Sequence, residues 1–299
     1  MQLKLLQLSF VLLFAKSLGA FHYRKLTSDE KLRNQSQNEV EVSPFIVDII
    51  NGTAVPDTKY PFLVFLEMFG SMFCGGSIFN EWTIITAAHC ISSSPDLNKL
   101  TNVVAGVVDR RNFSVSRQER RVKMAIIHPD YDRKTDSNDI AVLFLEEGLK
   151  FNENVDRVCL PWTGFEARHP IVAGWGKTEN GSSSEVLLEA SVPIFPHDQC
   201  VNNYAKHNVI ITDQMMCAGF EEGGIDTCEG DSGGPLFSAM YGNDDSTNTT
   251  DCNFVLVGIT SFGIGCAVPG YPGIYTKVIE YVDWIQNNTY QPWNIGASF

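Results

Sequence analysis

Short apolar runs separated by turn residues follow Ile49 along most of the chain. Five of these runs have the length and composition of β-strands, namely residues 62–65, 82–86, 102–108, 141–144 and 255–259. Short strands at this spacing are typical of an all-β barrel or sandwich. Only near the end do apolar residues recur at helical spacing, where Ile279, Val282 and Ile285 predict a helix over residues 278–287.

The first 48 residues differ in pattern from the rest of the chain. Residues 1–20 read as a signal peptide, because Lys4 precedes an apolar run over 5–14 that small residues follow. That run is too short to span a bilayer, and no later segment is a candidate span. Residues 21–48 are polar and charged, which predicts a poorly ordered propeptide. We therefore expect a secreted, extracellular protein without a membrane anchor.

The cysteine content agrees with an oxidising compartment. The chain has eight cysteines, an even number, which is typical of secreted proteins whose cysteines are paired in disulfides. Spacing alone does not choose among the possible pairings. A secreted chain can also carry glycans, and its Asn-x-Ser/Thr sequons begin at Asn34, Asn51, Asn112, Asn180, Asn248 and Asn287.

The size and charge of the chain limit its domain organisation and its expected partners. A chain of 299 residues, 44% of them hydrophobic, can bury a full core as one two-lobed unit or two small domains. The formal net charge of −13 excludes nucleic acid and anionic membranes as the expected partners.

The most informative motif is Glu229-Gly230-Asp231-Ser232-Gly233-Gly234-Pro235. Flanking glycines let the backbone approach a substrate carbonyl closely. The N–H groups of Gly230 and Ser232 can then form an oxyanion hole beside a serine nucleophile. Gly-Asp-Ser-Gly is also an ordinary turn composition, so this motif alone leaves both interpretations open.

Two upstream motifs favour the catalytic interpretation over the turn. A serine nucleophile needs a base, and the base needs an orienting group. His89 stands in Thr-Ala-Ala-His-Cys, and Asp139 stands in Ser-Asn-Asp-Ile-Ala-Val. With His89, Asp139 and Ser232 in this order, the chain resembles the trypsin-like (chymotrypsin-fold) serine proteases from about residue 49 to residue 290.

The resemblance implies a fold and a mechanism. The fold would be two six-stranded antiparallel β-barrels, at about 49–150 and 151–290, with a C-terminal helix and a tail at 291–299. His89 would act as general base and then general acid, Asp139 would orient it, and Ser232 would attack the scissile carbonyl. No cofactor is implied. Calcium-binding relatives carry a glutamate where this chain has Val107, so we expect no metal site in that loop.

The resemblance also implies a substrate pocket. Asp226 lies where trypsin-like members carry a carboxylate at the pocket base, and Gly263 and Gly273 match the glycines of its walls. A buried carboxylate favours Arg or Lys at P1, the residue before the scissile bond. Ser261 and Phe262 precede Gly263 in the edge strand that binds the substrate backbone, with Phe262 in place of the usual tryptophan. Glu229 would lie at the rim and repel acidic residues that flank the scissile bond.

Cysteine pairing follows from the family pattern. The resemblance implies the disulfides Cys74–Cys90, Cys200–Cys217 and Cys228–Cys266. Many relatives join the cysteine at position 159 to their prosegment, but the prosegment here has no cysteine. Cys159 and Cys252 therefore remain as the fourth pair.

The activation junction departs from the family. Ile49-Ile50-Asn51-Gly52 matches the mature N-terminus of relatives, whose new ammonium pairs with the carboxylate at Asp231. Most relatives carry Arg or Lys before the cut, whereas this chain carries Asp48. We expect activation by a protease of acidic or broad specificity, or cleavage elsewhere followed by trimming.

These residues predict a secreted zymogen of a serine endopeptidase that cleaves protein substrates after Arg or Lys. We expect a monomer, controlled by protein protease inhibitors. Val158-Cys159-Leu160-Pro161 and Ser261-Phe262-Gly263 resemble arthropod haemolymph proteases without a clip domain, which favours a role in an immune or clotting cascade. The alternatives are a broad-specificity digestive trypsin and a non-catalytic binding module, and the latter is disfavoured by an unbroken triad.

Overall fold

The computed structural model describes residues 49, 52–56, 59–92, 101–111, 115–179, 181–240 and 252–289. The chain divides into two units, residues 1–45 and 46–299. The expected signal peptide, the propeptide with Asp48, and the tail at 291–299 all lie outside the described residues. Within the described ranges, no helix is both long and apolar enough to cross a membrane.

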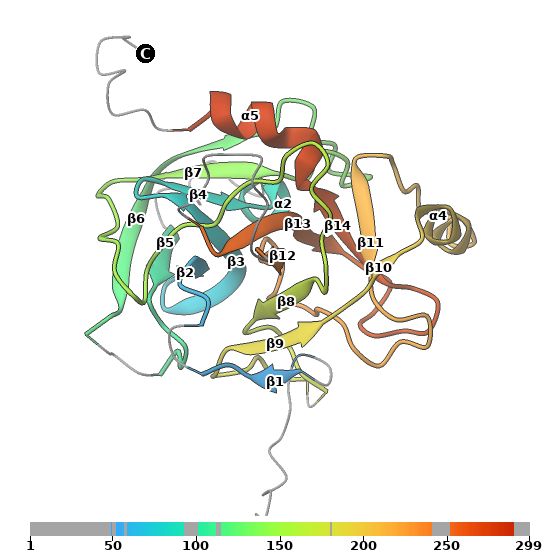
Figure 1. Cartoon of the computed structure of the whole chain (residues 1–299), viewed down its shortest axis with the longest axis horizontal. Helices are drawn as coiled ribbons and strands as arrows, with labels where there is room; N and C mark the ends of the chain where they lie inside the picture. Colours follow the sequence, from blue (N-terminus) through green and yellow to red (C-terminus); the bar gives the residue numbers. More distant parts are fainter. Residues whose placement is uncertain are drawn as a thin grey trace, which may run out of the picture. The chain divides into compact units, whose positions relative to one another are not determined.

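Six antiparallel strands form a closed barrel in the first half of the second unit (Figure 1). Strand β7 is buried at all five positions, and β2 is buried over its first four. The apolar runs of the sequence thus become the barrel interior. In barrel order the strands are β2 (Leu63–Met68), β3 (Ser71–Asn80), β4 (Thr83–Thr86), β7 (Ala141–Leu145), β6 (Gln118–Ile127) and β5 (Thr101–Ala105).

Seven strands of the second half, together with one strand from the start of the unit, form an eight-stranded antiparallel sheet. Its end strands, β1 (Thr53–Ala54) and β10 (Ile194–Phe195), have two residues each, and the six strands between them are longer. The expected all-β architecture is confirmed, but this sheet has eight strands where six were expected, and β1 belongs to the segment that was expected in the first barrel. The six are, in order, β9 (Leu188–Ser191), β8 (Ile171–Gly174), β12 (Pro235–Ala239), β13 (Phe254–Phe262), β14 (Gly273–Lys277) and β11 (Met215–Ala218).

Helices are few and short. The predicted C-terminal helix is present as a 3₁₀ turn, η1 (Val278–Tyr281), followed by α5 (Val282–Asn287). The expectation of helix only near the end was wrong, because α2 (Ala88–Ile91) and α4 (His197–Ala205) also form. Helix α4 buries only Cys200 and Tyr204, four residues apart. Two apolar contacts in a polar segment give too weak a period to be detected.

A cluster of aromatic rings joins the barrel to the second sheet. Phe237 on β12 lies 5.0 Å from Phe62 and 4.7 Å from Tyr60, and both contacts are edge-on. Phe254 on β13 closes the group at 5.6 Å from Phe237. Phe62 and Phe237 are fully buried. Edge-to-face packing of buried rings stabilises both sheets together.

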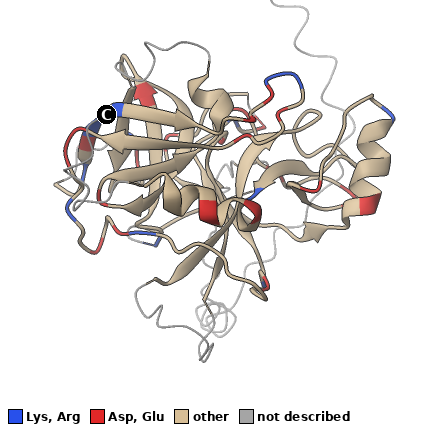
Figure 2. Ribbon diagram, turned by 90° about the horizontal axis from the view of Figure 1, so that it is seen from above, with Lys and Arg blue, Asp and Glu red and all other residues tan. Residues whose placement is uncertain are grey.

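All eight cysteines form disulfides, in the three pairs that the resemblance implied and in the fourth pair that remained. Cys74–Cys90 ties β3 to the short helix that carries His89, and Cys200–Cys217 ties α4 to β11. Cys228–Cys266 joins the loop before Ser232 to the loop after β13, and Cys159–Cys252 closes a loop of 93 residues. Most charged residues lie in connecting loops and at the ends of elements, while most of the strand ribbon carries none (Figure 2).

The aromatic cluster predicts a large cost for truncation at its centre. Phe237→Ala should lower the free energy of unfolding by about 3–5 kcal/mol, since the surrounding rings cannot collapse into the space. Urea denaturation of the full chain in a Ser232→Ala background, which prevents self-digestion, measures the change. Phe69→Ala is the matched control, because Phe69 is 80% exposed at a hairpin tip. A loss at Phe237 no larger than that at Phe69 would contradict the assignment.

Candidate active site

Strand pairing in the barrel brings His89 and Asp139 together. Strand β4 ends at Thr86 and β7 begins at Ala141, and these two residues are partners in the antiparallel register. His89 follows the first strand by three residues and Asp139 precedes the second by two, so both lie at the same end of the barrel. Two motifs about fifty residues apart are thereby placed side by side.

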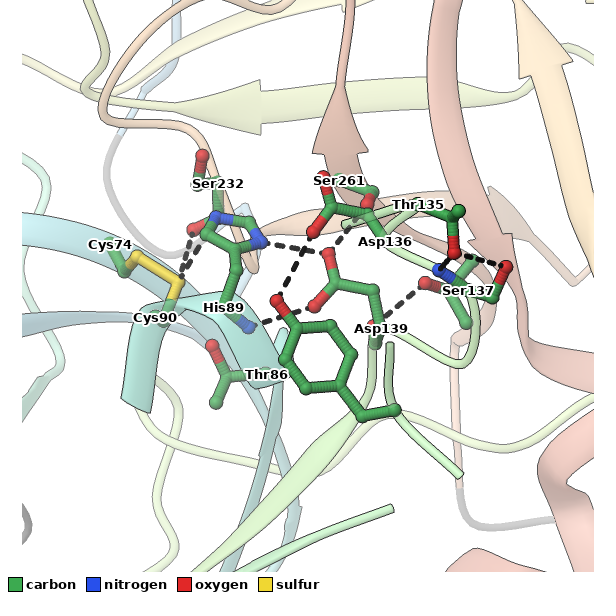
Figure 3. Close-up of polar contacts among 12 residues, drawn as sticks. Cys74, Thr86, His89, Cys90, Thr135, Asp136, Ser137, Asp139, Ser232 and Ser261 are labelled. Atoms are coloured by element: carbon green, nitrogen blue, oxygen red, sulfur yellow. Dashed lines mark hydrogen bonds and ion pairs between the residues drawn. A yellow bond between two sulfur atoms is a disulfide. The ribbon is translucent and has the colours of Figure 1, made fainter. Parts of the chain in front are cut away.

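The His89 ring and the Asp139 carboxylate form a tight pair (Figure 3). His89 Nδ1 lies 2.7 Å from Asp139 Oδ2, and the backbone N–H of His89 donates to Oδ1 at 2.8 Å. The hydroxyl of Ser261 donates to Oδ2 at 2.5 Å. Asp139 is fully buried, and these donors hold its carboxylate in one orientation.

The second sheet also fixes the segment around Asp139. Thr276 on β14 donates its hydroxyl to the Asp139 carbonyl at 2.7 Å, and the Tyr281 hydroxyl donates to Asn138 Oδ1 at 2.9 Å. Ser261 was expected only to bind substrate backbone. Its hydrogen bond to Asp139 gives it a second role, which is to hold that carboxylate in place. Thr276 and Tyr281 were missed, because no local motif marks a residue whose partner is more than 130 positions away.

The environment of His89 favours its charged form. Burial of the ring opposes protonation, but the hydrogen bond to Asp139 and the charges of Asp139 and Asp136 outweigh it and raise the pKa of His89. Ser232 lies beside the ring on the side away from Asp139 (Figure 3). With Nδ1 bonded to Asp139, the other ring nitrogen, Nε2, is on the Ser232 side of the ring, where Cys90 Sγ lies 3.7 Å from it.

The backbone around Ser232 leaves two N–H groups available. Asp231, Gly233 and Gly234 each donate to a backbone carbonyl. Among the described residues, the N–H groups of Gly230 and Ser232 donate to none. Gly230 has a φ of +100°, a conformation that a side chain would strain. A Cβ at Gly233 would lie 2.2 Å from Thr86 Oγ1, so this glycine lets the loop pack against the barrel.

Asp231 is a buried carboxylate beside this loop. It accepts the N–H of Gly176 at 2.8 Å and that of Cys228 at 3.1 Å. Burial raises the pKa of Asp231 to about 6, although these two backbone donors oppose the shift. Ile49, the expected new N-terminus, is 1% exposed and packs in a cluster with Val172 and Leu188 of the second sheet.

Asp226 forms the base of a second buried acidic site. It is 3% exposed and accepts the N–H of Thr227 at 2.8 Å and of Ala267 at 3.0 Å. Burial raises the pKa of Asp226 to about 7, with a smaller contribution from the charge of Asp231. A Cβ at Gly273 would lie 2.8 Å from Asp226 Oδ1, so only glycine there leaves the carboxylate uncovered. At Gly263 a Cβ would come within 3.3 Å of the Gly265 carbonyl.

Two residues expected at the substrate surface have neighbours that sequence did not indicate. Glu229 is exposed and forms an ion pair with Lys177, whose N–H also donates to the Glu229 carbonyl at 2.7 Å. Lys177 therefore partly compensates the charge that was expected to repel acidic substrates. Phe262 is partly buried and meets the Tyr204 ring edge-on at 6.3 Å, which holds the smaller aromatic platform in place.

One group in the described part of the chain has the spacing of a metal site, namely Cys74, His89 and Cys90. Both cysteines are in a disulfide with each other. A disulfide sulfur carries no thiolate charge, so this group does not offer the ligands that a metal ion requires.

Comparisons with known proteins agree with this geometry. The family described as Trypsin matches residues 49–285. The chain is 40% identical over 247 residues to Trypsin-1 of Astacus astacus, a match that covers 80% of this chain and 99% of that protein. It is 36% identical to the proclotting enzyme of Tachypleus tridentatus and 34% identical to melanization protease 1 of Drosophila melanogaster. Those two matches cover 79% and 80% of this chain and 65% of each relative.

The two buried carboxyls predict an unusual pH dependence of stability. Their pKa values in the folded chain lie at about 6 and about 7, above the ordinary value for aspartate. The stability that their protonation contributes is therefore complete below about pH 4 and is lost as pH rises through 6 and 7. Each group should lower the free energy of unfolding by up to about 1.4 kcal/mol per pH unit in this window.

Urea denaturation of the uncleaved Ser232→Ala protein between pH 4 and 8 measures this slope. Asp226→Ser should make the decline shallower, because it removes one of the two groups. Glu229→Gln, which neutralises an exposed acid, should leave the slope unchanged. An equal slope in wild type and Asp226→Ser would contradict the assignment.

Proposed function

Because the chain belongs to the trypsin family of serine endopeptidases, we propose that it hydrolyses peptide bonds after Arg or Lys through an acyl-enzyme on Ser232. The observation that carries the proposal is the pair formed by His89 and the buried Asp139 beside Ser232. The buried carboxylate of Asp226 carries the basic P1 preference.

In the proposed mechanism, His89 takes the proton of the Ser232 hydroxyl as its oxygen attacks the scissile carbonyl. Asp139 keeps the ring in the correct tautomer and stabilises the imidazolium. The N–H groups of Gly230 and Ser232 donate to no other group among the described residues. They donate hydrogen bonds to the developing oxyanion. His89 then protonates the leaving amine. In the second half of the reaction, water attacks the acyl group, and His89 takes a proton from the water and returns it to Ser232.

The P1 preference follows from charge pairing in a desolvated pocket. Burial that raises the pKa of Asp226 is unfavourable for its charged form. A guanidinium or ammonium group that enters above Asp226 supplies the missing counter-charge and stabilises the carboxylate. Gly273 keeps the approach open, and Cys228–Cys266 braces the two walls.

Activation is the second part of the proposal. We place a signal peptide at 1–20, a propeptide at 21–48 and the protease domain at 49–290. Cleavage before Ile49 frees an ammonium that pairs with Asp231, and this pairing orders the loop of Gly230. The buried state of both Ile49 and Asp231 supports the proposal. Four disulfides agree with a secreted enzyme. We propose that it acts as a monomer and meets protein substrates and inhibitors outside the cell.

A restricted cascade protease is favoured over a digestive enzyme. Two relatives are named for clotting and melanization, and the Asp48 junction makes self-activation unfavourable. The match to Trypsin-1 over 99% of its length keeps broad digestion as a second candidate. A positional-scanning peptide library separates the two, because a digestive enzyme accepts most residues around P1 and a cascade enzyme accepts few.

Two variants test the site. Ser232→Ala should lower kcat by at least about 10,000-fold, since the triad acts as a unit. Asp226→Ser should lower kcat/KM for an Arg substrate by about 100-fold, because it removes a desolvated charge pair. Kinetics with chromogenic peptides measure both, and a fluorophosphonate label should mark Asp226→Ser but not Ser232→Ala. Cleavage after Arg by Asp226→Ser at the wild-type rate would contradict the pocket.

A third variant tests the activation junction. The purified zymogen treated with trypsin should stay largely inactive, because an aspartate at P1 is repelled by the trypsin pocket. Asp48→Arg should activate readily under the same treatment. N-terminal sequencing and peptide hydrolysis follow the reaction. Prompt activation of wild type, with Ile49 as the new terminus, would overturn this prediction.

A further inference from the structure

A fourth acidic side chain, Asp136, lies near His89 (Figure 3). It is half-buried, and its charge acts on His89 strongly enough to contribute to the raised pKa of that ring. Its carboxylate accepts a hydrogen bond from Tyr131 and lies near Ser261, on the Asp139 side of the imidazole (Figure 3). Asp136 takes no part in the proposed triad, pocket or oxyanion site.

The backbone holds Asp136 in an uncommon conformation. Its φ is +51°, and that of Asn138 is +56°, in the segment that delivers Asp139 to the site. Aspartate and asparagine are the side chains that adopt this region most readily. The turn requirement accounts for Asp or Asn at this position, and it does not by itself account for a negative charge.

The charge of Asp136 is only partly balanced, by the charge of the His89 ring. The Tyr131 hydroxyl donates to Oδ1 at 3.1 Å. In the part of the chain that the structure describes, no lysine or arginine forms an ion pair with Asp136, and Oδ2 accepts no hydrogen bond. Burial, together with the charge of Asp139, raises the pKa of Asp136. A half-buried carboxylate with open acceptor positions is suited to bind a cation.

Substrate geometry places one residue next to this carboxylate. A substrate bound as in the proposed function has its scissile carbonyl at Ser232, its P1 side chain directed to Asp226 and its backbone along Ser261. The preceding residue, P2, has its Cα about 3.8 Å from that of P1. Its side chain therefore lies close to Ser261 and the His89 ring, and Asp136 is the acidic side chain beside these two residues in Figure 3.

We propose that Asp136 determines specificity by binding an arginine or lysine at P2, so that the preferred substrates carry two consecutive basic residues before the scissile bond. This inference rests on the proposed function, since it takes the P1 position as given. Asp226 then binds the side chain at P1, and Asp136 binds the side chain at P2. An ammonium or guanidinium at P2 relieves the unfavourable burial of the Asp136 charge.

Peptides with Arg at P1 and either Arg or citrulline at P2 test this inference, because citrulline has nearly the shape of arginine without its charge. The activated wild-type enzyme should cleave the arginine peptide with a kcat/KM at least about tenfold higher. In Asp136→Asn, which preserves the turn and its hydrogen bond with Tyr131, that ratio should fall to between 1 and about 2. Asp136→Glu should keep a preference for arginine.

The matched control is Asp130→Asn, which removes the same charge from an exposed position in the same loop and should keep the wild-type ratio. Each ratio is internal to one enzyme, so a partly folded variant does not distort it. A wild-type ratio near 1, an unchanged ratio in Asp136→Asn, or a preference that moves to P4 would overturn the inference. Failure to cleave any peptide after Arg would instead overturn the proposed function.

Discussion

The buried carboxylate of Asp139 is the interaction on which the site depends. A charge without solvent is strongly unfavourable unless donors surround it. Here the donors come from both halves of the protease unit, with His89 in the barrel and Ser261 on the second sheet. The barrel and the sheet must therefore be docked before His89 is oriented. Catalytic geometry and the junction between the two sheets are formed together.

The same junction is stabilised by apolar contacts away from the site. Phe62 and Phe237 meet edge-on across it, and both are fully buried. These contacts carry no orientation requirement for catalysis, but they supply the burial that offsets the cost of the charged pair. Disulfides add local bracing, and Cys74–Cys90 fixes the short helix of His89 to β3. A stable junction allows several carboxylates to remain in a desolvated cleft.

Those carboxylates share one physical property and differ in partner. Burial raises the pKa of Asp226, Asp231 and Asp136 alike. In the proposed enzyme, each is stabilised by a different cation: the P1 side chain, the new N-terminal ammonium and the P2 side chain. Substrate binding and activation then both act by supplying a counter-charge. In this proposal the pocket prefers a cation because its buried carboxylate is electrostatically unfavourable without a counter-charge.

The sequence alone was sufficient to predict the features that depend on residues close together in the chain. Apolar runs predicted five of the strands, and the three motifs around His89, Asp139 and Ser232 identified the family. Helix α4 was not predictable, because its apolar contacts come only from Cys200 and Tyr204 and its position is fixed by packing. The Lys177–Glu229 pair was not predictable either, since a charge in sequence does not indicate its partner across a loop.

What the sequence by itself determined was the order of the chemical groups, because Ser232, His89 and Asp226 each stand in a motif with restricted local composition. Only the tertiary structure decided their environment. Burial of Asp139 to zero exposure, the donors from Ser261 and Thr276, and the place of Asp136 beside His89 all depend on strands distant in the chain. Desolvation and hydrogen-bond geometry depend on the packed fold, and no local pattern of residues encodes them.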